Sequence, residues 1–542
     1  MAIKFGLHKL EDHILSMCID LFGDSAKLKV SIPKYVFGHL SINAPLVYGA
    51  QVSHDELLDK FKANLDSSYV RDCELKSGFI NFWLTDECIQ MLGSECVLAK
   101  GKFKSTNSQK INLEYISANP TGALHVGHLR GVYCDALARF LRFRGHDVEC
   151  DYYVNNVGHQ IQVLAESVMY QYSQLHGLNY LEPVEMYPGE YIKTIAAKVA
   201  CNELDKAYFM NFSVQENLEI IKDELALFGI GYDTWRFESD IIKEGLTEEA
   251  VSILKDKGYA QYGVLGEIRS GKGSASNREI LIFRRNPEDE GKALTSQDGS
   301  YTYFADDLGY YLDKVKRGFK TIIMSLGGDH IGHAQALEKA VECLDFGVPI
   351  NFIILQTVHF VRRGDKVKFS KRAGEVLSPK DIAKECEPHL VIFTLLTKSP
   401  NTQMTINLDE ISNISEDNPF YYLKYAYQRS LSLIKDNAIG SISIANYTKD
   451  MIELLYKLVQ WEHELRIIEK NLHVHRIIEY LTQTAQLFHS IWNQGRSNPE
   501  HRWIIEDNAK RTQDRLALVN LFKIILESGL SIIFSKLDML CD

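Results

Sequence analysis

The sequence predicts an α/β fold in which a parallel-sheet domain with a helical insertion lies between a small α+β domain and an all-helical bundle. Three observations lead to this prediction. From residue 106 to about 154 the chain reads as strand, glycine-rich turn, helix and strand, an order that gives parallel strands with a right-handed crossover. Residues 1–105 mix one helical stretch with alternating strand-like segments. Residues 417–542 show long helical periodicity, which is typical of a bundle.

The βαβ unit is the clearest local pattern. It begins with the apolar run INLEYIS, which reads as a buried strand ended by Ala-Asn-Pro. In the following stretch, GHLRGVYCDALARFLRFRG, one face carries Val132, Cys134, Leu137 and Leu141, and Gly145 ends the pattern. An amphipathic helix therefore leads to a second strand, DVECDYYV. Sheets of this Rossmann-like kind bind ligands at the carboxyl ends of their strands.

The rest of the chain is divided by changes in pattern. The sheet domain is predicted to span residues 106–396, with a mostly helical insertion at about 165–265 and further strands at EILIFR, TIIMSLGG and NFIILQTVHF. Residues 397–416 are polar, contain one proline and are predicted to form a linker to the bundle.

Composition excludes several classes of protein. The 542 residues are 45% hydrophobic, which is typical of full cores, and we expect neither a membrane-spanning run nor a secretory signal. None of the ten cysteines forms a C-x-x-C pair, so no zinc site or disulfide framework is expected and a reducing cytoplasm fits best. A net charge of −11 argues against nucleic-acid binding over the whole surface but allows a local basic groove.

The loop ANPTGALHVGH, residues 118–128, places two histidines after the first predicted strand in the spacing H-x-G-H. A strand end followed by a helix N-terminus favours phosphate binding. His125 and His128 can point the same way, so their N–H groups are suited to an oxygen that gains charge during phosphoryl displacement. Gly127 leaves space for a flat base against the backbone. The alternative interpretation is a tight turn with two surface histidines.

A second segment, GDKVKFSKRAG at residues 364–374, concentrates positive charge. Lys368, Lys371 and Arg372 lie around Ser370, and glycines stand at both ends. Such a loop is suited to holding a polyphosphate. Taken alone it would be interpreted as a solvated basic turn, but its combination with the histidine loop on one sheet favours a nucleotide site.

Together, HVGH and KFSKR resemble the two signatures of class I aminoacyl-tRNA synthetases. The segments EYISANPTGALHVGHLRG, YYVNNVGHQI, DGSYTYFADDLGYYLDK and GGDHIGH resemble, more narrowly, the arginyl-tRNA synthetase family, and the likeness covers nearly the whole chain. The resemblance implies a cytoplasmic ligase that activates L-arginine with ATP and Mg²⁺ and transfers it to tRNA(Arg). We expect it to act as a monomer.

The resemblance also implies roles for the two loops. His125 and His128 would contact the phosphates and ribose of ATP. Lys368 and Lys371 would neutralise the departing pyrophosphate, with Lys371 contributing most to the rate. The residues assigned to ATP binding are His125, Gly127, His128, Ser370 and Arg372.

Recognition of arginine needs hydrogen-bond acceptors, because the guanidinium is planar, always charged and presents five donors. By the resemblance, Glu114 in the first strand and Asp307 in YFADD supply carboxylates. Tyr303, four residues before Asp307, would orient the guanidinium if this segment is helical. Asn119 would hold the amino or carboxylate end, and Asp329 is a further candidate. A pocket of this kind rejects lysine and citrulline steeply, so no editing domain is expected.

Residues outside the sheet domain are expected to bind tRNA. In YYLKYAYQRSL, Tyr421, Tyr425 and Arg429 fall on one helix face and offer planes for unstacked anticodon bases, although tyrosines in the core of the bundle are an equal alternative. The bundle is thus the expected anticodon-binding domain. In the resembling family the N-terminal domain meets the tRNA elbow, which makes Asn81 in GFINFWL a candidate for reading a D-loop base.

Three features depart from the pattern of the resembling family. Phe369 replaces the usual Met, Asn156 stands where an Asp is common, and residues 37–43 differ from the usual segment. Two other functions fit parts of the pattern. One is a smaller nucleotidyltransferase with the same H-x-G-H loop, which would lack the helical tail. The other is an inactive paralogue that only binds RNA, against which the intact histidines and lysines argue.

Overall fold

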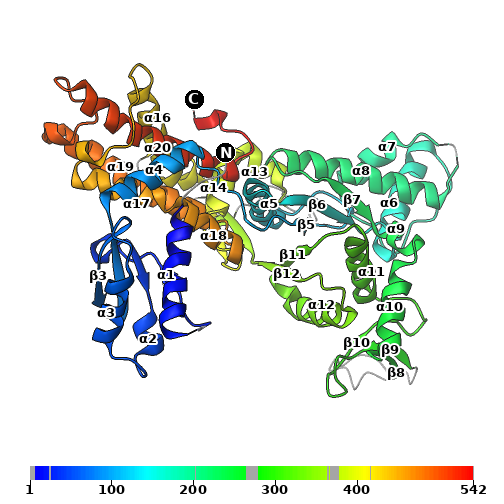
Figure 1. Ribbon diagram of the computed structural model, residues 1–542. Helices are drawn as coiled ribbons and strands as arrows, with labels where there is room; N and C mark the ends of the chain where they lie inside the picture. The colour runs from blue at the N-terminus through cyan, green and yellow to red at the C-terminus, as the bar shows by residue number, and fades with distance from the viewer. Residues whose placement is uncertain are drawn as a thin grey trace. The chain divides into compact units, whose positions relative to one another are not determined.

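The chain forms two compact units in the computed structural model (Figure 1). One unit contains the residues up to 105 together with those from 414 onward, and the other contains residues 106–413. The structure describes residues 6–23, 26–201, 203–263, 279–362, 365–366, 377–415 and 417–540.

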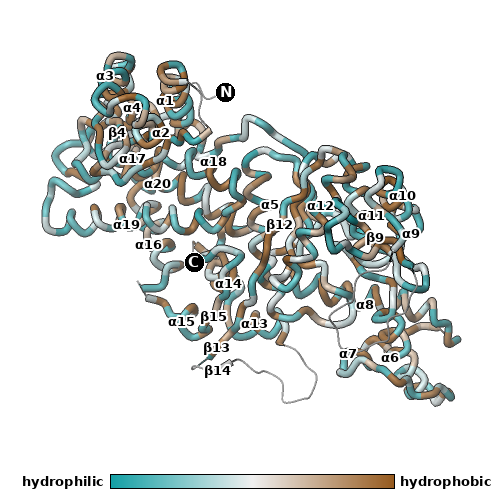
Figure 2. The backbone as a smooth tube through the Cα atoms, turned by 90° about the horizontal axis from the view of Figure 1, so that it is seen from below, coloured by the Kyte–Doolittle hydropathy of each residue, from teal (hydrophilic) through white to brown (hydrophobic). Residues whose placement is uncertain are grey.

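The unit of residues 106–413 is built on a parallel five-stranded sheet, as the sequence predicted. Its strands are β5 (Lys110–Glu114), β6 (Asp147–Val154), β7 (Thr234–Phe237), β11 (Thr321–Gly327) and β12 (Ile350–Leu355). They lie in the order β12-β11-β5-β6-β7, and every neighbouring pair is parallel. Strands buried in this way read as nearly continuous apolar runs, and Figure 2 shows the hydrophobic colouring of β12.

Helices connect the strands, as a parallel sheet requires. The helix predicted after the histidine loop is α5 (Val132–Arg144), and it ends where Gly145 takes a left-handed φ of 96° and closes the last turn. Its first residues are the exception, because Val126–Gly131 form the 3₁₀ helix η2. The other connecting helices are α6 (His159–His176), α7 (Glu190–Lys198), α8 (Lys206–Ala226), α9 (Glu238–Lys243), α10 (Leu246–Asp256), α11 (Tyr303–Lys316) and α12 (Ile331–Leu344).

One predicted strand belongs to a different sheet. EILIFR forms β9 (Ile280–Phe283), which pairs antiparallel with β8 (Ala260–Gly263) and β10 (Lys292–Ala293). The prediction that it completes the parallel sheet was therefore wrong. An apolar run predicts a strand, but it does not identify the partner strand.

The segment after β12 is also more structured than the sequence suggested. NFIILQTVHF splits into β12 and β13 (Val358–Arg362), and β13 pairs with β14 (Asp365–Lys366) and in parallel with β15 (Met404–Asn407). β15 and the short helix α15 (Leu408–Ile411) lie within residues 397–416, which the sequence analysis interpreted as a linker. Helices α13 (Pro379–Glu385) and α14 (Pro388–Leu395) precede them.

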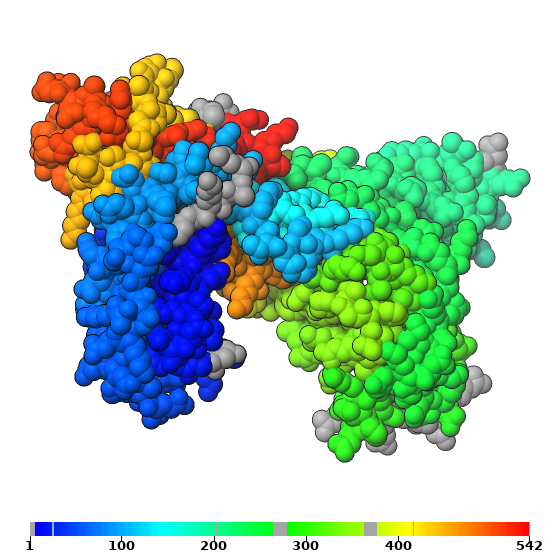
Figure 3. Space-filling view, viewed as in Figure 1, coloured from blue at the N-terminus to red at the C-terminus, as the bar shows by residue number. Residues whose placement is uncertain are grey.

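The other unit joins the two ends of the chain, and Figure 3 shows these ends, blue and yellow to red, lying against each other. Its antiparallel sheet has the order β1-β2-β4-β3. The elements from the N-terminal part are α1 (Leu7–Phe22), β1 (Val30–Ser31), β2 (Leu40–Ile42), α2 (Ala44–Tyr48), α3 (His54–Asn64), β3 (Val70–Lys76), β4 (Phe79–Leu84) and α4 (Asp86–Leu98). Those from the C-terminal part are α16 (Pro419–Ile434), α17 (Lys449–Val459), α18 (Trp461–Asn471), α19 (Arg476–Ser497) and α20 (Ala509–Ile533).

Helix α20 corrects one expectation. We expected no run long and apolar enough to cross a bilayer, whereas helix α20 contains an 18-residue window that is long and apolar enough by length and composition. Of this window, 72% is buried inside the protein, as in the central helix of a bundle. A helix that is apolar all round is typical of a buried core position.

His39 links the antiparallel sheet to the helical bundle. It is 4% exposed, its Nδ1 accepts a hydrogen bond of 2.9 Å from the Leu84 amide, and its ring centroid lies 4.4 Å from that of Tyr456 in α17. Burial, together with the positive charge of Arg71, lowers the pKa of His39 to about 4. His39 is therefore neutral in the folded protein at neutral pH.

We expect this histidine to make the stability of the unit depend on pH. The unfolded chain binds a proton at His39 below about pH 6.5, whereas the folded chain does so only below about pH 4. Stability is thus fully present above pH 6.5 and falls by about 3 kcal/mol towards pH 4. Chemical unfolding across this range measures the slope. His39→Gln should flatten it, whereas the exposed His13→Gln should leave it unchanged, and equal slopes in the two variants would contradict the assignment.

Candidate active site

A cavity of about 810 Å³ opens at the carboxyl ends of the parallel strands. β5 and β11 are neighbours here, but the chain continues from β5 towards one edge of the sheet and from β11 towards the other. This is the topological switch point at which α/β sheets bind ligands. The structure brings together at this cavity the predicted residues Glu114, Asn119, His125, Gly127, His128, Tyr303, Asp307 and Asp329.

Of the predicted basic loop, residues 364–374, the structure describes only residues 365–366. Lys368, Phe369, Ser370, Lys371 and Arg372 lie outside the described residues. The described segment that follows them does contact the histidine loop, because the Val126 amide donates a hydrogen bond of 2.8 Å to the Leu377 carbonyl oxygen.

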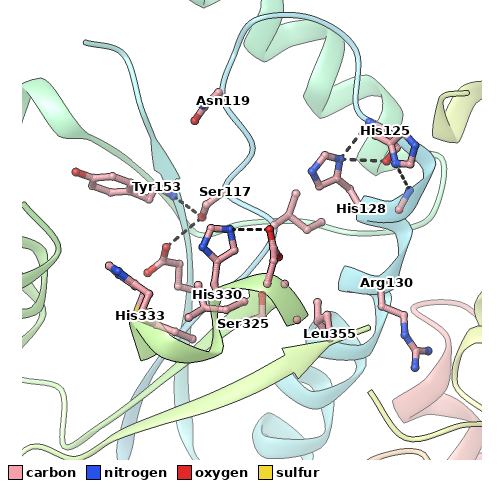
Figure 4. A pocket seen from close by; sticks show the side chains of 18 of the residues that line it. Ser117, Asn119, His125, His128, Arg130, Tyr153, Ser325, His330, His333 and Leu355 are labelled. Carbon is pink, nitrogen blue, oxygen red and sulfur yellow. Dashed lines mark hydrogen bonds and ion pairs between the residues drawn. The ribbon is translucent and has the colours of Figure 1, made fainter. Parts of the chain in front are cut away.

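The two histidines stand at the start of η2, on one side of the pocket (Figure 4). The Nδ1 of His125 accepts a hydrogen bond of 2.9 Å from the Gly127 amide, and the His128 ring lies with its centroid 6.5 Å away. Burial lowers the pKa of both rings, helped by His359 for His125 and by His125 for His128. Because Nδ1 of the neutral His125 ring is an acceptor, its proton is on Nε2, which remains available as a donor.

The opposite side of the pocket, where Figure 4 labels His333, is lined by carboxylates. Asp307 of α11 pairs with His333 of α12 at 2.6 Å. Glu238, the first residue of α9, is 3% exposed, and its Oε2 has no hydrogen-bond partner among the described residues. Burial raises the pKa of Glu238 to about 7, with further contributions from Asp306 and Asp307. Three carboxylates at one end of a cavity are a site for a cation with several donors.

Glu114 differs from these three carboxylates because its partner is a buried lysine. Its Oε2 accepts a hydrogen bond of 2.6 Å from Lys314 Nζ, and Lys314 is 1% exposed. Burial raises the pKa of Glu114, although Lys314 opposes this effect. The lysine neutralises much of the charge that the sequence analysis assigned to a guanidinium.

Two asparagines organise the loops around the pocket. Asn119 accepts a hydrogen bond of 2.6 Å from Asn155 and donates one of 2.7 Å to Gln160. Asn156, where the resembling family commonly has Asp, donates to the Ser239 hydroxyl at 2.9 Å and accepts from the Ser239 amide at 3.0 Å. It therefore fixes the start of α9, beside Glu238. The side chain of Asp329 is 81% exposed at the rim.

The candidate tRNA residues lie in the other unit. Tyr425 and Arg429 of α16 line a hollow of about 400 Å³, whose other lining residues are Tyr422, His489, Asn493 and Arg496. Tyr421 is not among the residues that line it. Asn81 is 4% exposed in β4 and lines a hollow of about 220 Å³ with Phe37, Lys76 and Phe79 among others.

Sequence reasoning missed Glu238, Asp306, Tyr153 and His333, all of which line the pocket. One signal was present, since Glu238 directly follows the strand TWRF and strand ends meet at one edge of a parallel sheet. That strand has only four residues, all of them half-buried, and it lacks the apolar pattern that marks the longer strands. His333 reaches Asp307 only because α12 packs beside α11, so the sequence alone does not place it in the pocket.

Two family models match the chain. The model described as tRNA synthetases class I (R), catalytic domain, matches residues 93–417, and the DALR anticodon binding domain matches residues 423–534. The first covers the parallel-sheet unit and the second covers most of the helical bundle.

Relatives match over nearly the full length. An arginine–tRNA ligase of Ehrlichia ruminantium is 32% identical, with 94% of this chain and 93% of that protein covered, and one of Wolbachia pipientis is 35% identical, with 84% of each covered. The solved structure of Thermus thermophilus arginyl-tRNA synthetase has the same fold, with a TM-score of 0.75, 19% identity, and coverage of 97% of this chain and 98% of that one. The chain therefore belongs to the arginyl-tRNA synthetase family of class I aminoacyl-tRNA synthetases.

Proposed function

We propose that this protein is an arginine–tRNA ligase that forms arginyl-adenylate from L-arginine and ATP and transfers the arginyl group to the terminal ribose of tRNA(Arg). One observation carries the proposal. A single cavity at the switch point of the sheet has an imidazole pair on one side and a group of carboxylates on the other. The first is suited to phosphates and the second to a guanidinium.

The arginine side chain would enter the acidic end of the cavity. Asp307, Asp306 and Glu238 provide acceptor oxygens for the donors of the guanidinium, and Tyr303 at the first position of α11 stands at the rim. Glu114, held by Lys314, would keep the floor of the pocket polar without adding a full negative charge. Asn119 and Asp329 would face the amino and carboxylate end.

ATP would occupy the histidine side. His125 Nε2 would donate to a phosphate oxygen, and Gly127 would leave room for the base. Lys368, Lys371 and Arg372 of the basic loop would hold the outer phosphates, with Ser370 shaping that loop. Among the described residues no group of three or more His, Cys, Asp or Glu side chains is arranged to hold a metal. Mg²⁺ is therefore proposed only as a companion of the triphosphate, and no step is assigned to it.

The reaction needs no nucleophilic side chain. A carboxylate oxygen of arginine attacks the α-phosphorus of ATP, the bond to the bridging oxygen breaks, and pyrophosphate leaves. The 2′-OH of the tRNA then attacks the arginyl carbonyl carbon, and AMP leaves with the bonding electron pair. The protein supplies positioning and electrostatic stabilisation, which is the usual mode in phosphoryl transfer.

The two hollows of the other unit are the proposed tRNA contacts. Arg429 lies 5.2 Å from the centroid of the Trp492 ring and hydrogen-bonds to His489 at 2.8 Å, so its guanidinium plane is held in place beside Tyr425. An anticodon base would stack there. Tyr421 stays a weaker proposal, and Asn81 would contact a base of the tRNA elbow.

The proposed location and assembly follow from other features. The nine described cysteines are all free thiols, which supports a reducing cytoplasm, and we propose a monomer.

Arginine binding is expected to depend on the ionisation of Glu238. Its pKa of about 7 makes half of the free protein carry a neutral side chain there at pH 7, and only the carboxylate pairs with a guanidinium. The arginine KM should therefore fall about tenfold per pH unit as pH rises towards 7, and level off above 8. Steady-state kinetics between pH 5.5 and 8.5 measure this. Glu238→Gln should bind arginine weakly with a flat profile, and an unchanged profile would contradict the assignment.

Charging of purified tRNA with each of the twenty labelled amino acids tests the function itself. Arginine alone should be esterified, with release of one AMP and one pyrophosphate for each arginyl-tRNA. Adenylyl transfer to another acid without tRNA would favour a different nucleotidyltransferase. Tight tRNA binding without esterification would favour an inactive RNA-binding paralogue.

A further inference from the structure

The turn that leaves β5 has an unusual backbone. Ile116 has a φ of 68° and Ser117 a φ of 43°, so two consecutive residues other than glycine adopt the left-handed region. This region is sterically costly for side chains that carry a Cβ and most costly for β-branched ones such as isoleucine. The turn lies between Glu114 and Asn119, at the edge of the cavity. Strain of this kind persists only where the surroundings enforce it.

The hydroxyl of Ser117 supplies one constraint. It donates a hydrogen bond of 3.2 Å to Glu114 Oε1 and accepts one of 3.1 Å from the Tyr153 amide in β6. Glu114 is itself held by the buried Lys314. Figure 4 shows Ser117 beside Tyr153.

The side chain of Ile116 supplies the second constraint. It lies against Gly131, the last residue of η2, where an added Cβ would be 2.4 Å from Ile116 Cγ1 and 2.6 Å from its Cδ1. Gly131 has φ −61° and ψ −17°, a right-handed helical conformation that any residue adopts. Its backbone therefore does not require glycine, whereas the space taken by Ile116 does.

We propose that Ile116 and Gly131 are positioning residues that lock the strained turn against η2 and so fix the arginine side of the cavity relative to the ATP side. Ile116 precedes Asn119 in the turn, and Gly131 ends the short helix η2, which His125 precedes and which contains His128. The contact sets how close a carboxylate held near Asn119 comes to a phosphate held by the histidines. A displacement of 1 Å between reacting groups costs a rate factor of about 10². The inference rests on the proposed function.

The test is a double-mutant cycle of Gly131→Ala and Ile116→Ala. The extra methyl group of Gly131→Ala pushes Ile116 away, and we expect kcat for arginylation to fall by about 10² while the KM values for arginine and ATP change less than threefold. Removing the Ile116 side chain in the same protein makes room, so the double variant should recover at least about tenfold in kcat. A rate loss that persists undiminished in the double variant, or a normal rate in Gly131→Ala, overturns the proposal.

Two further variants supply a control for the added methyl group and a test that does not depend on the folding of Gly131→Ala. Gly332→Ala in α12 is the matched control, because nothing lies within 4 Å of its added Cβ, and it should keep the wild-type rate. Ile116→Gly and Ile116→Ala both remove the contact, but only glycine relieves the strained φ of 68°. Both variants should lower kcat, and Ile116→Gly should have the higher thermal midpoint of the two; the reverse order of midpoints overturns the proposal even if Gly131→Ala fails to fold. Wild-type protein that charges no arginine would refute the proposed function instead, while the coupling between Ile116 and Gly131 in the thermal midpoint still tests the contact.

Discussion

Asp307→Asn is expected to lower kcat/KM for arginine by about 10³-fold. Bound arginine would cover the partly exposed Asp307, and removing one partner of an ion pair buried in this way costs about 3–5 kcal/mol. Asn keeps the shape of the side chain and can still hydrogen-bond to His333, which pairs with Asp307 at 2.6 Å. It loses the negative charge that we propose as a partner of the guanidinium. Glu238 and Asp306 remain, so the pocket still admits arginine but binds it weakly.

The effect should be confined to arginine. The KM for ATP and the tRNA dissociation constant should stay within about twofold of the wild-type values, because the histidine side and the other unit are untouched. Asp256→Asn, at the exposed end of α10, is the control for loss of one charge elsewhere in the unit. Steady-state kinetics with arginine as the varied substrate make the measurement. A near-normal arginine KM would show that Asp307 does not bind arginine.

Lys371→Ala is expected to slow arginyl-adenylate formation by about 10²–10³-fold, the usual cost of losing one charge-stabilising group in a transition state. Negative charge moves onto pyrophosphate as the bond to the α-phosphorus breaks, and a lysine in KFSKR is suited to neutralise it. Lys371 lies outside the described residues, so its role is inferred from the sequence and from this chemistry.

Single-turnover kinetics with saturating ATP and tRNA present measure that step. Binding of tRNA, followed separately, should change less than about twofold, because the lysine acts on a small leaving group. Lys384→Ala is the matched control, since Lys384 pairs with Asp381 at 3.0 Å and faces solvent. Equal losses in the two variants would indicate a general effect of charge. A normal rate in Lys371→Ala would contradict the assigned role.

Local patterns predicted the parts of the fold that depend on neighbouring residues. The first two strands of the sheet, the helix between them and its end at Gly145 follow from periodicity and from the left-handed preference of glycine, and the structure has them. The histidine loop lies, as predicted, between the first of these strands and the helix. A βαβ unit forms within one short segment, and its strand ends define the site.

Features that depend on distant residues were not predictable in this way. Lys314 is separated from Glu114 by 200 positions in the sequence, and no pattern near Glu114 indicates that Lys314 is its partner. On α16 the hollow is lined by Tyr422, Tyr425 and Arg429, whereas the sequence suggested Tyr421. Both sets fit one helical face, and only the packing of α19 decides between them.

The union of the two ends of the chain in one unit has a consequence for synthesis. Glu11 pairs with His463, and the Trp461 indole donates a hydrogen bond of 2.9 Å to the Gly101 carbonyl oxygen, so the earliest segment depends on the latest one for its contacts. Residues 106–413 are translated between them. At a ribosomal rate of about 5–20 residues per second, the N-terminal segment waits roughly 15–60 s for its partner. During that interval its apolar surface is open to chaperones, and the central sheet has time to fold first.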